Sequence, residues 1–339
     1  MLIVVMEQEA SVRQIGAVLK KIEDQGLQPH LSRGEQFTQI GCLDSPDENG
    51  LAEALGGLDG VARSFVSKGP YKLASREFHP ESSVVRVGGL PIGGKKLALI
   101  AGPCAVESHE QLAQVASLLK EMNVPFMRGG AFKPRTSPYS FQGMGKEGLE
   151  LLAEARARYG VRIVTECIAP GDVALVAEYA DMIQVGARNM QNFALLQELG
   201  MARIPVLLKR GMMSSLNEFL LSAEYILSNG NNQVMLCERG IRTFETMTRN
   251  TLDIAAVPIL KRLSHLPVIV DPSHAAGDRG LVPALAMAGV AAGADGLIVE
   301  VHPVPEKSVS DADQAMSFEG FQQMVVSLRE VARAVGREF

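Results

Sequence analysis

Apolar and polar positions alternate over residues 1–67 in a pattern that predicts a small α/β unit. Apolar residues at 12, 15, 18, 19 and 22 predict a helix over 11–25, and 49–55 predicts a shorter one. Four runs predict strands: LIVVM (2–6), LQPHLS (27–32), FTQIGCL (37–43) and VARSFVS (61–67). The order β-α-β-β-α-β is that of a ferredoxin-like (βαββαβ) domain.

A second pattern begins at residue 97, where strand-like runs alternate with helical stretches. The predicted strands are LALIAG (97–102), VPFMRGG (124–130), RIVTE (162–166), MIQVGA (182–187), PVLLKR (205–210), QVMLCE (233–238), PVIVDPS (267–273) and GLIVEV (296–301). The helical stretches include 110–122, 146–159, 192–199, 216–227, 280–292 and 318–335. Eight units of about 28 residues, each near the size of one βα unit, predict a (β/α)8 TIM barrel. An open doubly wound sheet is the alternative, but no GxGxxG follows an early strand.

Between the two patterns, residues 68–96 contain glycine pairs at 88–89 and 93–94. Such pairs are typical of turns and linkers, and the flanking apolar residues suggest a short hairpin. We therefore divide the chain into a ferredoxin-like domain over 1–67, a linker with a hairpin over 68–96 and a barrel over 97–339.

Composition narrows the class of protein. The chain has 339 residues, of which 47% are hydrophobic and 21% charged, with a net charge of −5. These values exclude a disordered chain, and the absence of a basic tail argues against nucleic acid as a partner. The longest uncharged apolar stretch, 281–294, is too short to span a membrane. The N-terminal residues do not resemble a signal peptide, and the four cysteines are widely spaced. We therefore expect a cytoplasmic protein with reduced thiols.

Charged residues gather where the predicted barrel strands end, which is where barrels build their active sites. Six cations stand there, too many for a solvated rim in an acidic chain. Arginine side chains bind phosphate and carboxylate groups with two hydrogen bonds, so the pattern predicts anionic ligands. The six cations are Arg128, Lys133, Arg135, Arg188, Lys209 and Arg239.

Four other side chains form a mixed set of ligand types: Cys104, His274, Glu300 and Asp311. They follow strands 1, 7 and 8, and closure of the barrel brings strand 8 beside strand 1. One thiolate, one imidazole and two carboxylates suit a divalent transition metal. Each residue also has an ordinary explanation, because a cysteine can fill a core and the acids can pair with the arginines. His302, two residues beyond Glu300, is a substitute ligand or a structural residue.

Seven motifs occur in series: GPCAVES, RGGAFKPRTSPYSFQG, QVGARNMQN, LLKRGM, CERGIRTFE, DPSHAAG and IVEVHP. Together they resemble 3-deoxy-D-arabino-heptulosonate 7-phosphate (DAHP) synthases, in the microbial subtype with an N-terminal ferredoxin-like regulatory domain. The resemblance covers essentially the whole chain. It implies a transferase that condenses phosphoenolpyruvate with erythrose 4-phosphate and water, giving DAHP and phosphate in the first step of the shikimate pathway.

The resemblance also implies roles for particular residues. One divalent ion (Mn²⁺, Fe²⁺, Co²⁺, Zn²⁺ or Cd²⁺) and no organic cofactor is expected, held by Cys104, His274, Glu300 and Asp311. Phosphoenolpyruvate would bind Arg128, Lys133, Arg188, Lys209 and Arg239. Erythrose 4-phosphate would bind Lys133, Pro134, Arg135, Thr136 and Asp311. The catalytic set is Lys133, Glu166, Cys104 and His274, with Lys133 or a metal-bound water donating a proton to the nascent alkoxide.

For the small domain, the resemblance implies feedback inhibition by tyrosine or phenylalanine. His30 and Ser32, in the segment HLSRG, match the effector contacts of the family. The alternative is that both are exposed polar residues on an edge strand. The resemblance further implies a homotetramer.

Three other functions are compatible with a barrel of this kind. A 3-deoxy-D-manno-octulosonate 8-phosphate synthase uses the same chemistry on arabinose 5-phosphate, but its loop after strand 2 typically reads Lys-Ala-Asn-Arg, where this chain has KPRT at 133–136. An inactive amino-acid-binding regulator would be expected to have lost ligands or cations. An aldolase-type lyase would need a Schiff-base lysine, for which Lys209 is the candidate.

Overall fold

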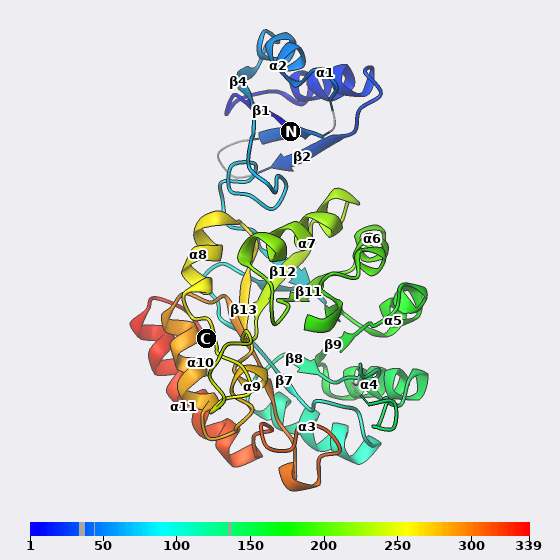
Figure 1. The fold of residues 1–339 in the computed structure, drawn as a ribbon, viewed down its shortest axis with the longest axis vertical. Helices are drawn as coiled ribbons and strands as arrows, with labels where there is room; N and C mark the ends of the chain where they lie inside the picture. The colour runs from blue at the N-terminus through cyan, green and yellow to red at the C-terminus, as the bar shows by residue number, and fades with distance from the viewer. Residues whose placement is uncertain (34–37, 44, 135–136) are drawn as a thin grey trace. The chain divides into compact units, whose positions relative to one another are not determined.

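The computed structural model describes residues 1–33, 38–43, 45–134 and 137–339, and the chain divides into two compact units (Figure 1). One unit comprises residues 1–82 together with 263–265. The other comprises residues 83–262 and 266–339. No helix in the described part of the chain is long and apolar enough to cross a membrane.

The first unit contains a four-stranded antiparallel sheet with two helices. Its elements are β1 (Leu2–Met6), α1 (Val12–Glu23), β2 (Pro29–Arg33), β3 (Thr38–Cys42), α2 (Glu48–Gly56) and β4 (Val61–Val66). The strand order β2-β3-β1-β4 confirms the predicted ferredoxin-like fold. Alternate residues of β1 pack against the apolar stripe of α1, which places Val4 beside Val18 and Ile22 in one core.

In the second unit, a hairpin of β5 (Val85–Val87) and β6 (Leu90–Ile92) precedes the barrel. Gly88 and Gly89 form its turn, both with positive φ, where residues with a Cβ are disfavoured. Val85, Val87 and Ile92 join one buried cluster with residues near the strand starts, such as Ala98 and Phe126. The hairpin therefore fills the end of the barrel at which the strands begin, which we call the base.

Eight parallel strands close into a barrel, as predicted. They are β7 (Ala98–Gly102), β8 (Phe126–Arg128), β9 (Arg162–Glu166), β10 (Met182–Val185), β11 (Val206–Lys209), β12 (Val234–Glu238), β13 (Val268–Val270) and β14 (Gly296–Glu300). The last strand pairs with the first, with Leu297 opposite Leu99. This closure brings residues about 200 positions apart in sequence to adjacent strand ends.

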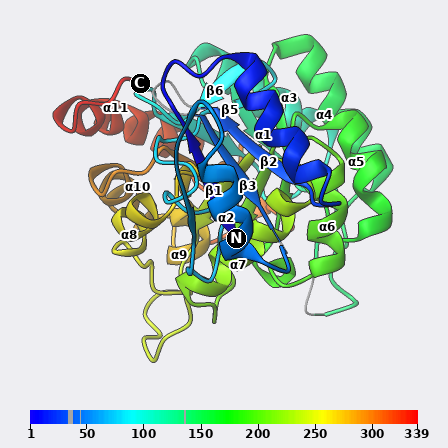
Figure 2. The same cartoon turned by 90° about the horizontal axis from the view of Figure 1, so that it is seen from above.

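Helices surround the strands in a ring when the barrel is seen end-on (Figure 1), and they lie on both sides of it in the view turned by 90° (Figure 2). They are α3 (His109–Glu121), α4 (Lys146–Tyr159), α5 (Val173–Tyr179), α6 (Phe193–Met201), α7 (Leu216–Ser228), α8 (Ala256–Leu263), α10 (Val282–Ala291) and α11 (Phe318–Ala334), and the short α9 (Pro272–Ala276) directly follows β13. Single 3-10 turns lie at η1 (Pro170–Asp172), η2 (Ala187–Asn189) and η3 (Pro305–Lys307). The apolar pattern did not single out α5 and α8, because they have only 7 and 8 residues and α8 contains Pro258.

Candidate active site

The end of the barrel at which the strands finish, here called the mouth, carries the predicted site residues. A cavity of about 310 Å³ opens there. Its walls include residues that lie at or after the ends of seven strands, β8 to β14: Lys133, Glu166, Arg188, Lys209, Arg239, His274 and Asp311. The backbone is closely packed beneath it: a Cβ at Gly102 would lie 2.2 Å from the carbonyl oxygen of Arg128, so β7 can end only in glycine.

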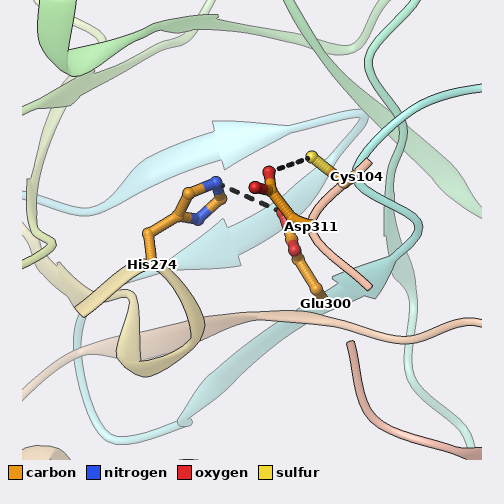
Figure 3. A group of neighbouring side chains, drawn as sticks. All are labelled: Cys104, His274, Glu300 and Asp311. Atoms are coloured by element: carbon orange, nitrogen blue, oxygen red, sulfur yellow. Dashed lines mark hydrogen bonds and ion pairs between the residues drawn. The ribbon is translucent and has the colours of Figure 1, made fainter. Parts of the chain in front are cut away.

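The structure brings the four predicted metal ligands together. One ligand atom from each of Cys104, His274, Glu300 and Asp311 lies within 4.8 Å of all the others. Figure 3 shows the four side chains pointing toward a common point from the loop after β7, from α9, from β14 and from the loop after β14. Cys104 Sγ donates to Asp311 Oδ2 at 3.0 Å, and His274 Nε2 lies 3.2 Å from Glu300 Oε1.

Burial and neighbouring charges together set the pKa values in this cluster. Burial raises the pKa of the Cys104 thiol to about 12, and the Glu300 carboxylate adds to the rise. Burial also acts to raise the pKa of Asp311, but His274 and the Cys104 hydrogen bond outweigh it, so that the pKa is lowered. Burial lowers the pKa of His274 despite two neighbouring carboxylates. The protein thus presents a neutral thiol, a neutral imidazole and ionised acids.

Lys133 lies directly against the cluster. Its Nζ donates to Cys104 Sγ and to the Cys104 carbonyl oxygen, both at 2.9 Å. Burial works against its charge, but nearby negative groups such as Glu166 outweigh it and the pKa of Lys133 is raised. A charged amine therefore stands between the cluster and the cavity, where it can hold an anion or give up a proton.

Asp271 joins two of the predicted functional side chains, although the sequence did not single it out as a site residue. Its Oδ2 accepts from Lys209 Nζ at 2.5 Å and lies 2.7 Å from His274 Nδ1. Its Oδ1 accepts from the backbone N–H of His274 at 2.9 Å and caps α9. Burial alone would raise the pKa of this carboxyl, but His274 and Lys209 hold it well below its usual range.

Arg128 approaches the cluster from β8. Its Nη2 pairs with Glu300 Oε1 at 3.2 Å and its Nε donates to the carbonyl oxygen of Pro103. Its Nη1 is buried without a hydrogen-bond partner. A buried guanidinium with an unused donor is costly unless a ligand satisfies it, so this nitrogen marks a place for an acceptor.

Glu166, at the end of β9, also has an unused atom. Gln184 donates to its Oε2 at 3.0 Å, while its buried Oε1 has no hydrogen-bond partner. A Cβ at Gly186 would lie 2.1 Å from Oε1, so the glycine leaves room for the carboxylate. The sequence reasoning missed Gln184, which is the one polar residue inside the strand next to Glu166.

A further cation was missed. Arg249, in the loop after β12, lines the cavity and donates to Asp311 Oδ1 at 2.9 Å. Of the predicted residues, Pro134 lines the cavity, while Arg135 and Thr136 lie outside the described residues. His302 does not join the cluster and instead pairs with Glu107.

The two units match two protein-family models. Residues 82–336 match the DAHP synthetase I family, and residues 2–64 match the DAHP synthase ferredoxin-like domain. The chain belongs to the DAHP synthetase I family. The resemblance read from the seven motifs is therefore confirmed, and the chain is an enzyme of the DAHP synthase family.

Comparison with individual proteins supports the assignment of this chain to the DAHP synthetase I family. The phospho-2-dehydro-3-deoxyheptonate aldolase of Thermotoga maritima is 51% identical over 99% of both chains. A crystal structure of that DAHP synthase covers 99% of this chain with a TM-score of 0.79, and a truncated form covers 80% with a TM-score of 0.75. A 2-dehydro-3-deoxyphosphooctonate aldolase of Desulfatibacillum aliphaticivorans is 31% identical over 71% of this chain and 94% of its own.

Proposed function

We propose that the chain condenses phosphoenolpyruvate with erythrose 4-phosphate and water to give DAHP and phosphate, as the first step of the shikimate pathway. The observation that carries this proposal is the buried cationic wall beside the four-residue cluster, with the unused Nη1 of Arg128. Phosphoenolpyruvate carries about three negative charges near neutral pH and its partner about two more. Such ligands need the charge that these side chains supply.

In this proposal, Arg128, Lys133, Arg188, Lys209 and Arg239 bind phosphoenolpyruvate. Lys133, Pro134, Arg135, Thr136 and Asp311 bind erythrose 4-phosphate. Holding two anions together against their repulsion, in a fixed orientation, removes much of the entropic cost of the reaction. Four of these cations are buried, so water competes weakly with the ion pairs that they would form: Arg128, Lys133, Lys209 and Arg239.

The donor set at the cluster fits a divalent transition metal, and Cys104, His274, Glu300 and Asp311 would hold it. A thiol sulfur, an imidazole nitrogen and two carboxylate oxygens converge there, and the buried Oε1 of Glu300 makes no hydrogen bond. When bound, the ion would supply Lewis-acid polarisation of the aldehyde oxygen. The ligand types leave the identity of the metal open among Mn²⁺, Fe²⁺, Co²⁺, Zn²⁺ and Cd²⁺.

The protein side chains account for the remaining steps. The C3 carbon of phosphoenolpyruvate attacks the aldehyde carbon and a C–C bond forms. Lys133, which is charged at neutral pH, is placed to protonate the resulting alkoxide. Water then adds at C2, the C2–O bond breaks and inorganic phosphate leaves. Glu166 lines the cavity and its Oε1 makes no hydrogen bond, so this carboxylate can accept the proton that the attacking water loses.

For the ferredoxin-like unit we propose binding of tyrosine or phenylalanine as a feedback inhibitor. His30 and Ser32 are two residues apart on β2, so they lie on the same face of the sheet, and burial lowers the pKa of His30. Ser32 pairs in register with Gln39, whose buried Oε1 has no hydrogen-bond partner. A homotetramer and a cytoplasmic location complete the proposal.

The test is phosphate release from phosphoenolpyruvate with erythrose 4-phosphate, run with and without a chelator and beside arabinose 5-phosphate. We expect activity on the four-carbon sugar that a chelator abolishes and Mn²⁺ restores. Activity only on arabinose 5-phosphate would favour the octulosonate synthase. No release from either sugar by metal-loaded protein would overturn the proposed reaction. Adding tyrosine or phenylalanine to the same assay tests the effector site.

A further inference from the structure

One buried carboxylate, Asp271, contacts both a predicted metal ligand and a predicted substrate cation. We propose that Asp271 is the positioning residue of the metal centre: it fixes the orientation and tautomer of His274 so that Nε2 is free for the metal. The inference rests on the proposed function, because it assumes that the four-residue cluster binds a divalent ion.

The contacts of the two ring nitrogens determine which tautomer His274 adopts. His274 faces one carboxylate with each ring nitrogen, Asp271 Oδ2 at 2.7 Å from Nδ1 and Glu300 Oε1 at 3.2 Å from Nε2. Asp271 Oδ2 also accepts from Lys209 Nζ, so in its contact with Nδ1 the ring nitrogen is the donor. A neutral imidazole has one N–H, and the shorter contact takes it. The proton therefore resides on Nδ1, and the Nε2 lone pair points toward Cys104, Glu300 and Asp311.

The two oxygens of Asp271 accept hydrogen bonds from different parts of His274. Oδ1 accepts from the backbone N–H of His274 and fixes the start of α9. Oδ2 accepts from His274 Nδ1 and from Lys209 Nζ. Backbone and ring of the same histidine are thus fixed by one side chain that is itself fully buried. Outer carboxylates of this kind, bonded to a ligating histidine, orient the ring and raise its basicity.

The contact between Lys209 and Asp271 also holds the carboxylate in place. Lys209 is almost completely buried, and its Nζ forms an ion pair with Asp271 Oδ2. Because Oδ2 accepts from both Lys209 Nζ and His274 Nδ1, rotation of the carboxylate is limited. A cation expected to bind phosphoenolpyruvate thereby also holds the residue that orients the metal ligand.

The test variant is Asp271→Asn, which keeps the shape of the side chain but has one acceptor oxygen. With that oxygen at the Oδ1 position, the amide N–H groups face Lys209 Nζ and His274 Nδ1, so the imidazole must move its proton to Nε2. With the amide reversed, the α9 cap is lost. Either way the metal site is disturbed, and we expect Mn²⁺ and Cd²⁺ to bind roughly 10- to 100-fold more weakly.

Asp295→Asn is the matched control. Asp295 is equally buried at the base, between the starts of β13 and β14, where it accepts from the backbone N–H of Val268 and from Lys261. The same substitution there removes the same charge from a similar bonding pattern. Metal dissociation constants are measured by competition with a chromophoric chelator in the absence of substrates, so no turnover is needed. We expect Asp295→Asn to bind metal as the wild type does.

A second measurement needs no variant and covers failure of Asp271→Asn to fold. In the metal-free wild type, the ring nitrogen shifts of ¹⁵N-labelled His274 should show a protonated Nδ1 and a bare Nε2. A proton on Nε2 would overturn the inference, as would an Asp271→Asn protein that binds metal within threefold of the wild type. If the wild type binds no metal, the proposed metal centre itself fails, which is a different result.

Discussion

The mouth of the barrel leaves buried polar atoms unsatisfied, whereas the base satisfies them. Among the described residues, three of the four buried side-chain atoms without a hydrogen-bond partner belong to Arg128, Glu166 and Glu300, all at the mouth. At the base, Asp295 receives bonds from Val268, Lys261 and Arg337. Since an unsatisfied buried group costs about 1–3 kcal/mol, the mouth is stable in spite of these atoms, and the ligands that we propose would satisfy them.

The comparison is tested most strongly by Cys104→Ser. We expect loss of activity on the order of 10³-fold, because the change removes the thiol donor and with it several kcal/mol of metal-assisted stabilisation. The thermal midpoint should move little, since serine is nearly isosteric. The measurements are kcat/KM for phosphate release and a calorimetric melt. An active Cys104→Ser enzyme would mean that the cluster is structural, like Asp295.

Glu166→Gln should give the next largest effect. We expect kcat to fall about 10²-fold, the contribution typical of a general base, because the amide cannot take up a proton. Stability should stay the same or rise, because a neutral side chain replaces a buried charge with an unused oxygen. Steady-state kinetics and denaturant unfolding of the same preparations measure both. Gln184→Leu, which removes only the donor to Oε2, should reduce kcat less.

At the base, we expect Asp295→Asn to lower stability and leave activity nearly unchanged. We expect unfolding free energy to drop by about 1–3 kcal/mol, because Lys261 and Arg337 lose part of their partner, while kcat/KM stays within twofold. Urea unfolding and phosphate release measure the two quantities. A large loss of activity with unchanged stability would show that function is not confined to the mouth.

The smallest effect concerns pH and His265, which precedes β13. Burial lowers the pKa of this histidine to about 3, and the neighbouring His79 contributes. In the unfolded chain the same group has a pKa of about 6.5. Between these two pKa values the unfolded state binds the extra proton, so the free energy of unfolding decreases as the pH is lowered.

We therefore expect the native state to lose about 1 kcal/mol between pH 7.5 and 5.5, with full stability above about pH 7. Urea unfolding at both pH values measures the loss. A His265→Gln variant lacks the titrating group and should show a smaller difference between the two pH values. An unchanged difference would assign the effect to other groups.

The architecture was predictable because each βα unit carries its own apolar run and the runs recur at a regular spacing. The closeness of Cys104 to Glu300 followed from closure of the barrel alone, and β14 does pair with β7. Short helices were harder to predict from the sequence. The five-residue helix α9 has no periodicity to detect, although Asp271 before Pro272 is a capping pattern.

The missed site residues share a physical reason. Arg249 lies in a long polar loop, and it is held at the cavity by hydrogen bonds from its N–H to Ala276 and from its guanidinium to Asp311 and Gln314. No local pattern encodes such contacts. Asp271 and Gln184 stood at visible strand positions, but their roles depend on which side chains lie opposite in neighbouring strands. Sequence reasoning predicts the strand ends and leaves these partners open.

The pairing of β14 with β7 has a consequence for synthesis of the protein. Cys104 leaves the ribosome early, whereas Glu300 and Asp311 emerge about 200 residues later. A nascent chain that still lacks β14 has made most of its cations but has no complete set of four ligands. Assembly of the cluster therefore coincides with closure of the ring, so capture of a metal ion would report that translation has passed the last strand. A fragment that stops short of β14 should remain without the ion at any concentration that loads the closed barrel.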